Sequence, residues 1–512
     1  MKFLKTILSL ACVLMFISLE SSVLGGVSFQ TLISFSGTNG PNWGSTWGTG
    51  RTAAMVQAGD GNLYGAAQMG GYTPSGDWAG FGTAFRITPD GSFGVLHYFG
   101  TVTNSFDFAM DGYWPLGDLT VGADGNIYGT VAESGATSQT TYPNGYGVAG
   151  GAVFQITPSG TYSILHAFAD DAVYDSSVSS YVAACGIYPY AGVTQGRDGN
   201  FYGTTTRGGH LGRGAIFMVD PSGASTLLYQ FPTNYSPGGV ISGLIQGDDG
   251  AFYGTTQYGG DYSLGSVFRF VPGVSFTTLY SFNAGAPATN GIEPISNLCK
   301  GSDGNLYGTT STAIPSLNAG TIFRISTNGL LTTLHAFSGD INDGGTPEGG
   351  LIQGSDGNLY GTTYGGGADN YYGTVYQLTL DGKFTLLHSF RAPSNGLNAD
   401  GMHPTATLVQ ASNGSFYGTT SGAGAYGYGT IFRLTVTPDA PMIQGMATTN
   451  GTVSFSWNAG IGSIYQVQFT TNFLTGSWTN LGVTNTATQS TMSASDSIGT
   501  DAQRFYRVVL VR

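Results

Sequence analysis

The chain has 512 residues, a hydrophobic fraction of 41%, a charged fraction of only 9% and a formal net charge of −13. Such an acidic chain is a poor partner for nucleic acid or an anionic membrane, because both bind basic surfaces. The 84 glycines and the lack of a sustained helical period predict an all-β fold with many tight turns.

Residues 1–25 have the pattern of a secretory signal peptide. Two lysines in Met1-Lys2-Phe3-Leu4-Lys5 precede an apolar run, and small residues near Gly25 are typical of a cleavage site. We therefore expect a secreted or cell-surface protein. No later stretch has the roughly 20 apolar residues of a transmembrane helix, so we expect no membrane span. Cys185 and Cys299 belong to repeats that are not neighbours, so we expect two unpaired thiols.

One short sequence, Asp-Gly-Asn-Leu-Tyr-Gly or a close variant, recurs seven times. Successive copies are 51 to 74 residues apart, which is close to the length of a four-stranded propeller blade. The copies begin at Asp60, Asp124, Asp198, Asp249, Asp303, Asp356 and Asn413.

Two further strand patterns accompany these turns. One is typified by Gly320 to Ile325, and the other alternates as Leu-His/Tyr-x-Phe, as in Leu334 to Phe337. Period-two alternation bounded by Asp-Gly turns predicts antiparallel hairpins. The second pattern occurs six times after a turn and once before the first turn, at Phe29 to Phe35. We therefore predict a seven-bladed β-propeller over residues 26–437, with four-stranded blades and the N-terminal strand closing the last blade.

Residues 438–512 have a different pattern. Short alternating runs such as Thr452 to Trp457, Tyr465 to Phe469 and Phe505 to Leu510 follow a proline-flanked linker. About 70 residues of such strands predict a small β-sandwich.

The combination of the three repeated patterns resembles the Gloeo-Verruco (GloVer) extracellular repeat and covers residues 29–435. The C-terminal segment resembles a fibronectin type III-like domain, with Tyr465, Trp478 and Phe505 to Val508 as the matching residues. The resemblance implies an extracellular propeller with no established activity. It carries over no catalytic residues.

The predicted blades have two different ends. With strands named A to D in chain order, the A–B and C–D turns are short and share one end. The B–C and D–A loops are long and share the other. Several D–A loops finish in a common Asp/Asn-Gly-x-x-Pro sequence, here termed the lead-in segment, at 111–115, 290–294, 343–347 and 400–404. We expect any function at the long-loop end, because variable loops on a rigid scaffold gather binding residues.

Two sets of repeated polar residues have structural interpretations. The Asp of the repeated turn could ligate calcium, but Asn413 in its place favours an Asx turn that caps backbone N–H groups. One position of strand D is a histidine in four repeats and a tyrosine, Tyr229 or Tyr280, in two others. This exchange indicates packing or local hydrogen bonding rather than metal binding. The four histidines are His97, His166, His335 and His388. We expect no metal and no cofactor.

Aromatic and polar residues of the long loops form the predicted ligand site. Flat rings beside acids are typical of surfaces that stack on sugars or bind a protein chain. The alternative is that the rings pack their own loops and that the acids form turns. The predicted ligand-binding residues are Trp43, Trp47, Trp78, Trp114, Tyr188, Tyr190, Tyr371, Asp111, Asp343 and His403.

The sequence favours a monomeric, non-catalytic module that binds a polysaccharide or a cell-surface protein. One alternative is a polysaccharide hydrolase or lyase at the mouth of a central channel, and another is a structural spacer. Two carboxylates facing each other across a pocket beside the channel would favour the enzyme. Its candidate acids are Asp107, Asp111, Asp170, Asp171, Asp175, Asp261, Asp340, Asp343, Glu348, Asp369 and Asp400.

Overall fold

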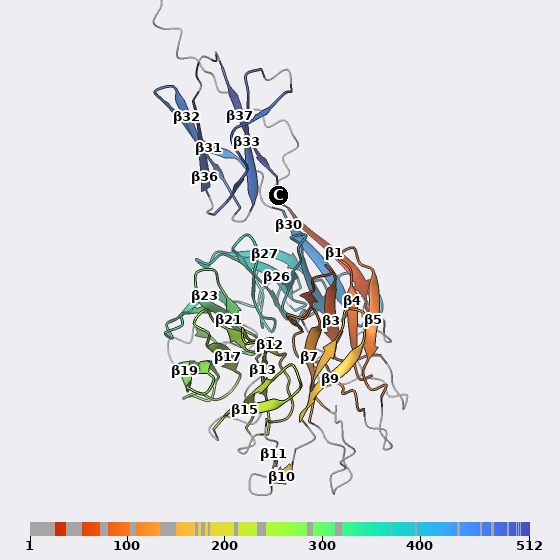
Figure 1. Cartoon of the computed structure of the whole chain (residues 1–512). Helices are drawn as coiled ribbons and strands as arrows, with labels where there is room; N and C mark the ends of the chain where they lie inside the picture. The colour runs from red at the N-terminus through yellow and green to blue at the C-terminus, as the bar shows by residue number, and fades with distance from the viewer. Residues whose placement is uncertain are drawn as a thin grey trace, which may run out of the picture. The chain divides into compact units, whose positions relative to one another are not determined.

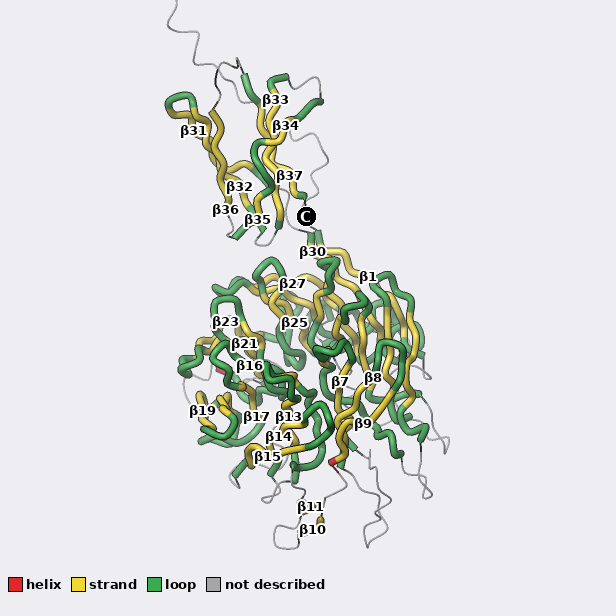
Figure 2. The backbone as a smooth tube through the Cα atoms, in the orientation of Figure 1, coloured by secondary structure: helices red, strands yellow, loops and turns green. Residues whose placement is uncertain are grey.

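Strands and loops make up almost all of the described chain, and no α-helix occurs in it (Figure 2). None of its segments is a helix long and apolar enough to cross a bilayer. One compact unit comprises Phe29–Gly354 and Asn358–Leu434, and another contains Thr435–Arg512. The computed structural model describes residues 26–36, 54–71, 80–102, 109–133, 150–168, 173–175, 180–182, 185–208, 213–232, 242–283, 290–312, 320–369, 371–394, 397–437, 441–460, 463–472, 476–488, 491–497, 499, 501 and 503–511.

The larger unit is built from four-stranded antiparallel sheets, and the described residues contain seven of them (Figure 1). Sheets 1 to 3 contain β2 (Val56–Gln57), β3 (Leu63–Ala67), β4 (Thr83–Ile87), β5 (Phe93–Tyr98); β6 (Thr120–Val121), β7 (Ile127–Val131), β8 (Ala152–Ile156), β9 (Tyr162–Ala167); and β12 (Thr194–Gln195), β13 (Phe201–Thr205), β14 (Ala215–Val219), β15 (Ser225–Gln230). A separate hairpin pairs β10 (Val173–Asp175) with β11 (Ser180–Val182).

Sheets 4 to 6 repeat the same order of strands. They contain β16 (Ile245–Gln246), β17 (Phe252–Thr256), β18 (Ser266–Val271), β19 (Ser275–Ser281); β20 (Cys299–Lys300), β21 (Leu306–Thr310), β22 (Gly320–Ile325), β23 (Leu331–Phe337); and β24 (Ile352–Gln353), β25 (Leu359–Thr363), β26 (Thr374–Leu378), β27 (Phe384–Ser389). Neither Cys185 nor Cys299 forms a disulfide in the described structure.

Sheet 7 joins the two ends of the repeat region. Its strands are β28 (Val409–Gln410), β29 (Phe416–Thr420), β30 (Thr430–Val436) and β1 (Val27–Ser34). The pairing of β1 with β30 places the N-terminal strand where its alternation predicts. The amide of Phe35 donates to the carbonyl of Gly429 at 2.9 Å, and the ring of Phe29 stacks on Phe432 at 5.1 Å.

The seven sheets pack in chain order, and the last packs against the first. Successive apolar clusters each join two consecutive sheets from sheet 1 to sheet 6. Tyr360 of sheet 6 lies 4.0 Å from Phe416 of sheet 7, measured between ring centroids. One further cluster contains Phe35 and Ile431 of sheet 7 together with Phe85 of sheet 1. The order of packing is therefore cyclic.

The repeated turn is an Asx turn, as predicted. The Asp60 carboxylate accepts hydrogen bonds from the Asn62 backbone N–H at 3.0 Å, the Asn62 side-chain amide at 2.7 Å and the Tyr64 hydroxyl at 2.7 Å. Burial raises the pKa of Asp60, but the hydrogen bonds from Tyr64 and Asn62 outweigh it and leave the pKa lowered. The same contacts recur at Asp124, Asp198 and Asp303.

The glycine after the repeated tyrosine leaves room for an aromatic ring of strand C. A Cβ on Gly308 would lie 2.5 Å from Cζ of Phe323 and 2.9 Å from a methyl carbon of Leu298. Equivalent contacts below 3 Å occur at the corresponding glycines of the other sheets: Gly65, Gly129, Gly203, Gly254, Gly361 and Gly418. The repeated Tyr-Gly pair therefore fixes how strand B packs on strand C.

The repeated Thr-Thr pair does more than favour a strand, which is how the sequence alone explains it. The first hydroxyl reaches the segment that follows the lead-in proline of the next sheet: Thr255 donates to the carbonyl of Ser296 at 3.1 Å. The second pairs with strand C of its own sheet, as in the 2.8 Å contact between the buried hydroxyls of Thr310 and Thr321. Buried hydroxyls therefore tie neighbouring strands and neighbouring sheets together.

Two of the strand D histidines bond to the nearby lead-in segment, as predicted. His97 Nε2 lies 3.0 Å from the Asp111 carboxylate, and its ring stacks on Tyr162 of the next sheet at 4.0 Å. His335 Nε2 lies 2.9 Å from the Asp343 carboxylate. The Asp of the lead-in segment is therefore held against strand D of the preceding sheet.

The C-terminal unit consists of two antiparallel sheets with a shared core. Trp457 of one sheet lies 6.2 Å from Tyr465 of the other, and both are buried. One sheet contains β31 (Ile443–Thr449), β32 (Thr452–Asn458) and β36 (Thr491–Ser497), and the other contains β33 (Ile464–Thr470), β34 (Thr479–Asn480), β35 (Asn485–Thr486) and β37 (Phe505–Leu510).

Candidate functional site

The lead-in segments and the B–C loops lie at the same end of the sheets, as predicted. Isolated β-bridges join the two in five sheets: Tyr113 to Glu133, Ile187 to Arg207, Ile292 to Thr312, Gly345 to Gly365 and Met402 to Gly422. The segment at 185–189 occupies the same place as the predicted lead-ins, although it begins with Cys185.

The residue before the lead-in proline has a left-handed backbone in all five segments. Its φ angle lies between 53° and 61°, which is unusual for a residue with a side chain. This backbone directs the amide of Trp114 to the carbonyl of Phe81 in the preceding sheet at 3.0 Å, and its carbonyl to the amide of Ala132 at 3.0 Å. Because five sheets share this feature, the strain belongs to the repeat and does not mark one site. The five residues are Trp114, Tyr188, Glu293, Thr346 and His403.

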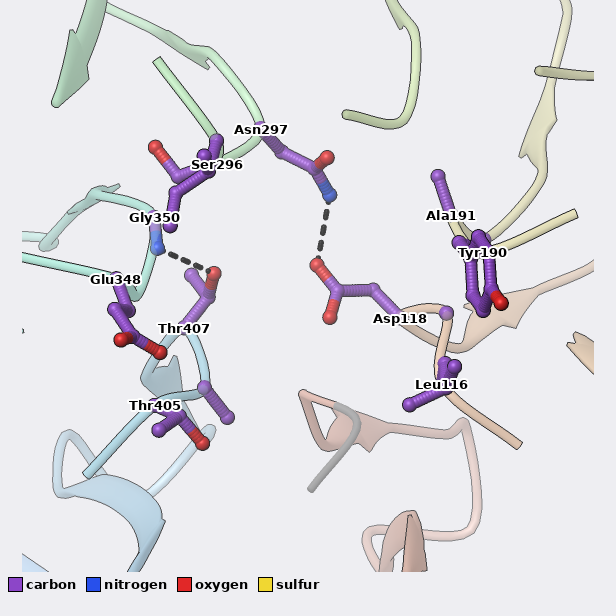
Figure 3. Close-up of a pocket in the computed structure, with 14 residues that line it drawn as sticks. Leu116, Asp118, Tyr190, Ala191, Ser296, Asn297, Glu348, Gly350, Thr405 and Thr407 are labelled. Carbon is purple, nitrogen blue, oxygen red and sulfur yellow. Dashed lines mark hydrogen bonds between the residues drawn. The ribbon is translucent and has the colours of Figure 1, made fainter. Parts of the chain in front are cut away.

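The residues that follow these prolines surround a polar pocket, here termed the axial pocket (Figure 3). Its volume is about 50 Å³, and roughly 10–15 Å³ of such volume holds one water molecule. The position directly after proline supplies Leu116, Tyr190, Ile295, Glu348 and Thr405, and the position two residues later supplies Asp118, Gly192, Asn297, Gly350 and Thr407. The five segments thus contribute equivalent backbone positions but different side chains.

A hydrogen bond crosses the axial pocket between sheets that are not neighbours. The Asn297 side-chain amide donates to Oδ2 of Asp118 at 2.7 Å (Figure 3). Oδ1 of Asp118 accepts from the amide of Ala54 at 3.0 Å, and Oδ1 of Asn297 accepts from the amide of Gly243. Each side chain therefore caps the equivalent amide of the preceding sheet while the pair spans the pocket.

An aromatic group lies beside the pocket on sheets 2 and 3. The rings of Tyr188 and Tyr190 stack at 6.2 Å, and the Arg207 guanidinium lies 5.6 Å from the centre of the Tyr188 ring. The Tyr113 hydroxyl donates to the Glu133 carboxylate at 3.0 Å. Since Tyr190 also lines the axial pocket, the stacked rings and the polar pocket form one continuous site.

Burial and charge change the pKa values of this group. Burial raises the pKa of Glu133, and the Tyr113 hydrogen bond and the Arg207 charge offset this only in part. Burial, with the Glu133 charge, also raises the pKa of Tyr190. A partly buried carboxylate that accepts a hydrogen bond from a tyrosine hydroxyl and is influenced by an arginine charge is therefore part of the site.

A second aromatic group lies on sheets 6 and 7. The buried ring of His403 stacks on Tyr364 at 4.1 Å, and Tyr371 meets it edge-on at 5.0 Å. His403 Nδ1 lies 2.9 Å from the carbonyl of Tyr364, and burial lowers the pKa of the histidine. Tyr371 is 57% exposed. His403 thus supports the exposed ring from below instead of presenting its own imidazole to solvent.

The structure brings only some of the predicted ligand-binding residues together. Trp114, Tyr188 and Tyr190 lie in or beside the first aromatic group, while Tyr371 and His403 form part of the second. Asp111 and Asp343 hold the D–A loops in place instead: Asp111 accepts from the amides of Gly100 and Thr101, and Asp343 from the amide of Ser338. Trp43, Trp47 and Trp78 lie outside the described residues.

The sequence analysis did not predict four residues of the site. Asp118 and Asn297 are three residues past the prolines, at positions where other repeats have glycine or threonine. Glu133 and Arg207 are the B–C loop residues of two of the isolated β-bridges. At the same position the last two repeats have Gly365 and Gly422, which carry no charge. A comparison of side chains at equivalent positions could have found all four.

No group of three or more His, Cys, Asp or Glu side chains that could hold a metal occurs among the residues described. The repeated turn does not supply such a group, because its Asp binds the Asn and Tyr of its own turn.

The fold and the site define a class: an all-β tandem-repeat protein with a polar pocket among the loops at one end of its sheets. The sequence model of the Gloeobacter/Verrucomicrobia repeat matches residues 176–368 and 241–488. The chain therefore belongs to the Gloeobacter/Verrucomicrobia repeat family, as its motifs predict. No curated protein sequence matches it.

Solved structures with some similarity include two hydrolases of puromycin and a glycosidase. A puromycin hydrolase shares 12% identity (TM-score 0.41, 83% of this chain and 62% of that chain), and a Mycobacterium tuberculosis puromycin-hydrolyzing peptidase shares 11% (0.43, 82% and 61%). An α-L-arabinofuranosidase from Fusarium graminearum shares 9% (0.39, 81% and 98%). The chain spans less than two thirds of the length of the first two.

Proposed function

We propose that residues 26–437 form a seven-bladed β-propeller and that residues 438–512 form a fibronectin type III-like sandwich. The propeller is supported by the seven four-stranded sheets among the described residues of this range, by their cyclic packing and by the return of β1 to sheet 7. In a closed ring each sheet packs between two others, so no sheet lies at an open end of the array. The sandwich is supported by two sheets that share the Trp457 and Tyr465 core.

We propose that the protein is a secreted or cell-surface module that binds carbohydrate at the long-loop end. The observation that carries this proposal is the position of Tyr190, which lines the axial pocket and stacks on Tyr188. A sugar presents an apolar C–H face and several hydroxyls, so an aromatic surface continuous with a polar pocket complements both. Residues 1–25 support secretion through their signal-peptide pattern.

The polar groups of the site suit hydroxyl recognition. Asp118 and Glu348 can accept hydrogen bonds from sugar hydroxyls, and both line the axial pocket. Arg207 offers a donor beside the Tyr188 ring, and Glu133 offers an acceptor beside the Tyr113 hydroxyl. The pocket itself is small, so it would hold a substituent or a chain end while the rest of the sugar lies against the rings.

A polysaccharide hydrolase is the second candidate, because Asp118 and Glu348 line the same pocket. Glycoside hydrolysis uses two carboxyl groups on either side of the scissile bond. Release of reducing ends from a polysaccharide panel, abolished by Asp118→Asn and Glu348→Gln in folded protein, would support the enzyme. Binding without such release would support the module.

A glycan array tests the binding proposal. Tyr190→Ala should weaken capture of the bound glycans by at least tenfold, about 1.4 kcal/mol, because it removes the ring that joins the two parts of the site. Tyr262→Ala is the matched control, since Tyr262 is 58% exposed in the B–C loop of sheet 4 and lies outside the site. Equal glycan binding by both variants, or no glycan binding by the wild type, would contradict the proposal.

A further inference from the structure

The two aromatic groups are built on the same backbone position in different sheets. Tyr188 of sheet 3 and His403 of sheet 7 each directly precede a lead-in proline, and their φ angles are 61° and 55°. In each segment the residue directly after the proline lines the axial pocket: Tyr190 in sheet 3 and Thr405 in sheet 7. The same short stretch of backbone therefore connects each aromatic group to the pocket.

The two groups lie on opposite sides of the axial pocket. Figure 3 shows Tyr190 on one side, and Thr405 with Glu348 on the other. In the cyclic packing order, sheets 4 to 6 lie between sheets 3 and 7 in one direction, and sheets 1 and 2 lie between them in the other. Burial, followed by the charges of Tyr371 and Glu348, raises the pKa of Tyr364 to about 12. The charge of a residue in the pocket lining thus acts on the second aromatic group.

Each group offers an aromatic ring to a ligand. Tyr371 is 57% exposed and lies edge-on to His403 at 5.0 Å, while Tyr188 and Tyr190 stack at 6.2 Å. A sugar residue has an apolar C–H face that packs against such rings. A chain of sugar residues can therefore contact both groups while a residue between them directs a substituent into the polar pocket. A chain that ended in the pocket would contact only one group.

The charges of the site favour an uncharged chain. Asp118 and Glu348 line the axial pocket, and its described lining residues include no lysine, arginine or histidine. In the first aromatic group Glu133 is acidic and Arg207 is basic. These four residues supply three carboxyl groups and one guanidinium, and the whole chain has a formal net charge of −13. A polysaccharide with carboxylate or sulfate groups would therefore be repelled.

We propose that the long-loop end binds the interior of a neutral polysaccharide chain, which crosses the axial pocket from the Tyr188 and Tyr190 stack to Tyr371. This inference rests on the proposed carbohydrate function and specifies the ligand. The pocket, with a volume of about 50 Å³, would take a substituent of an internal sugar residue. A chain that reaches both groups gains its second contact without a second loss of translational freedom, so affinity should rise with chain length.

A series of chain lengths tests the inference by calorimetric titration of the full-length protein. The neutral probes are cello-, xylo-, manno- and laminari-oligosaccharides from disaccharides to decasaccharides, and oligogalacturonides are the acidic probes. In at least one neutral series the longest members should bind about tenfold more tightly than the disaccharide. The oligogalacturonides should bind more weakly than that series at every length, because each residue carries a carboxylate.

Two variants should separate the contributions of the aromatic groups. Tyr371→Ala should weaken binding of the longest neutral chains by about fivefold and of the disaccharide by less than about twofold, because only a long chain reaches this ring. Tyr190→Ala should weaken binding at every length, because this ring lines the pocket. Tyr262→Ala, which removes an equally exposed ring from the B–C loop of sheet 4, is the control and should change neither.

Circular dichroism should show that each variant is folded. Affinity that does not rise with length in any neutral series, equal losses at short and long lengths in Tyr371→Ala, or oligogalacturonides bound as tightly as neutral chains would overturn the inference. Each of these results would leave carbohydrate binding itself in place. A wild-type protein that binds no glycan, in these titrations or on the array, would overturn both proposals.

Discussion

The two ends of the repeat sheets use carboxylates in opposite ways. At the short-turn end, the pKa of Asp303 is lowered, because hydrogen bonds from Asn305 and Tyr307 outweigh the effect of burial. At the long-loop end, burial raises the pKa of Glu133 despite the hydrogen bond from Tyr113 and the charge of Arg207. The turn therefore stabilises the ionised form of Asp303, whereas burial in the loop destabilises the ionised form of Glu133. Repeated acids therefore serve the fold, and the acid that differs between repeats belongs to the proposed ligand site.

The largest effect should follow a change in the repeated strand packing. Gly308→Ala places a Cβ within 2.5 Å of the Phe323 ring and should lower the free energy of unfolding by about 3 kcal/mol. Gly304→Ala is the matched control: its φ is +80° but nothing lies within 4 Å, so backbone strain alone should cost about 1 kcal/mol. Urea denaturation measures both. Equal losses would show that the contact with Phe323 is not the constraint.

A smaller effect should follow loss of one buried hydroxyl pair. Thr310→Val removes the 2.8 Å contact with Thr321 and should reduce the free energy of unfolding by about 1–2 kcal/mol. Thr332→Val, on the exposed side of β23, should change it by less than about 0.5 kcal/mol. A loss at Thr332 as large as that at Thr310 would contradict the role given to the buried pair.

The repeated turn should make stability depend on pH in a defined direction. A carboxyl whose pKa is lower in the folded state stabilises the fold above its unfolded pKa, and this contribution is lost as pH falls through the folded value. Asp303→Asn, which copies the natural Asn413, should cost about 0.5 kcal/mol at pH 7 and flatten the acid limb of the stability curve. Denaturation curves between pH 2 and 7 check this. An unchanged acid limb would argue against the turn as its source.

The first copy of the repeated turn, at Asp60 to Tyr64, should also make stability depend on pH in the alkaline range. Burial and the Asp60 hydrogen bond raise the pKa of Tyr64 to about 12. A group with a raised folded pKa stabilises the fold below its unfolded pKa, so this contribution should disappear as pH rises from about 10 to 12. Tyr64→Phe should be less stable at pH 8 and lose less stability on the way to pH 12. A parallel alkaline decline of both proteins would exclude Tyr64 as a contributor.

The smallest change in stability should occur at the long-loop end. Glu133→Gln keeps an acceptor for Tyr113 and should alter the free energy of unfolding at pH 7 by less than about 0.5 kcal/mol. Its sign should be stabilising, because a carboxyl with a raised pKa weakens the fold as pH rises above the unfolded value. Calorimetry between pH 4 and 8 checks the sign. A destabilised variant at pH 7 would mean that the Glu133 charge supports the fold.

Several structural features could be predicted because the chain repeats them. The Asx turns, the strand D histidines and the shared end of the lead-ins and B–C loops follow from comparing copies within one sequence. The sequence explains the repeated Thr-Thr pair only in part, since its hydroxyls contact another strand and another sheet. Asp111 and Asp343 were assigned to the ligand site, but the structure places their carboxylates against their own loops.

The sequence by itself determined the all-β class, the repeat family and the place of the N-terminal strand, because local patterns repeated many times specify which strands pair. Only the tertiary structure joined Asp118 to Asn297 and placed Tyr190 and Glu348 in the lining of one pocket. These residues come from different sheets, and their proximity depends on how the sheets pack around one another. No pattern within a single repeat encodes that distance.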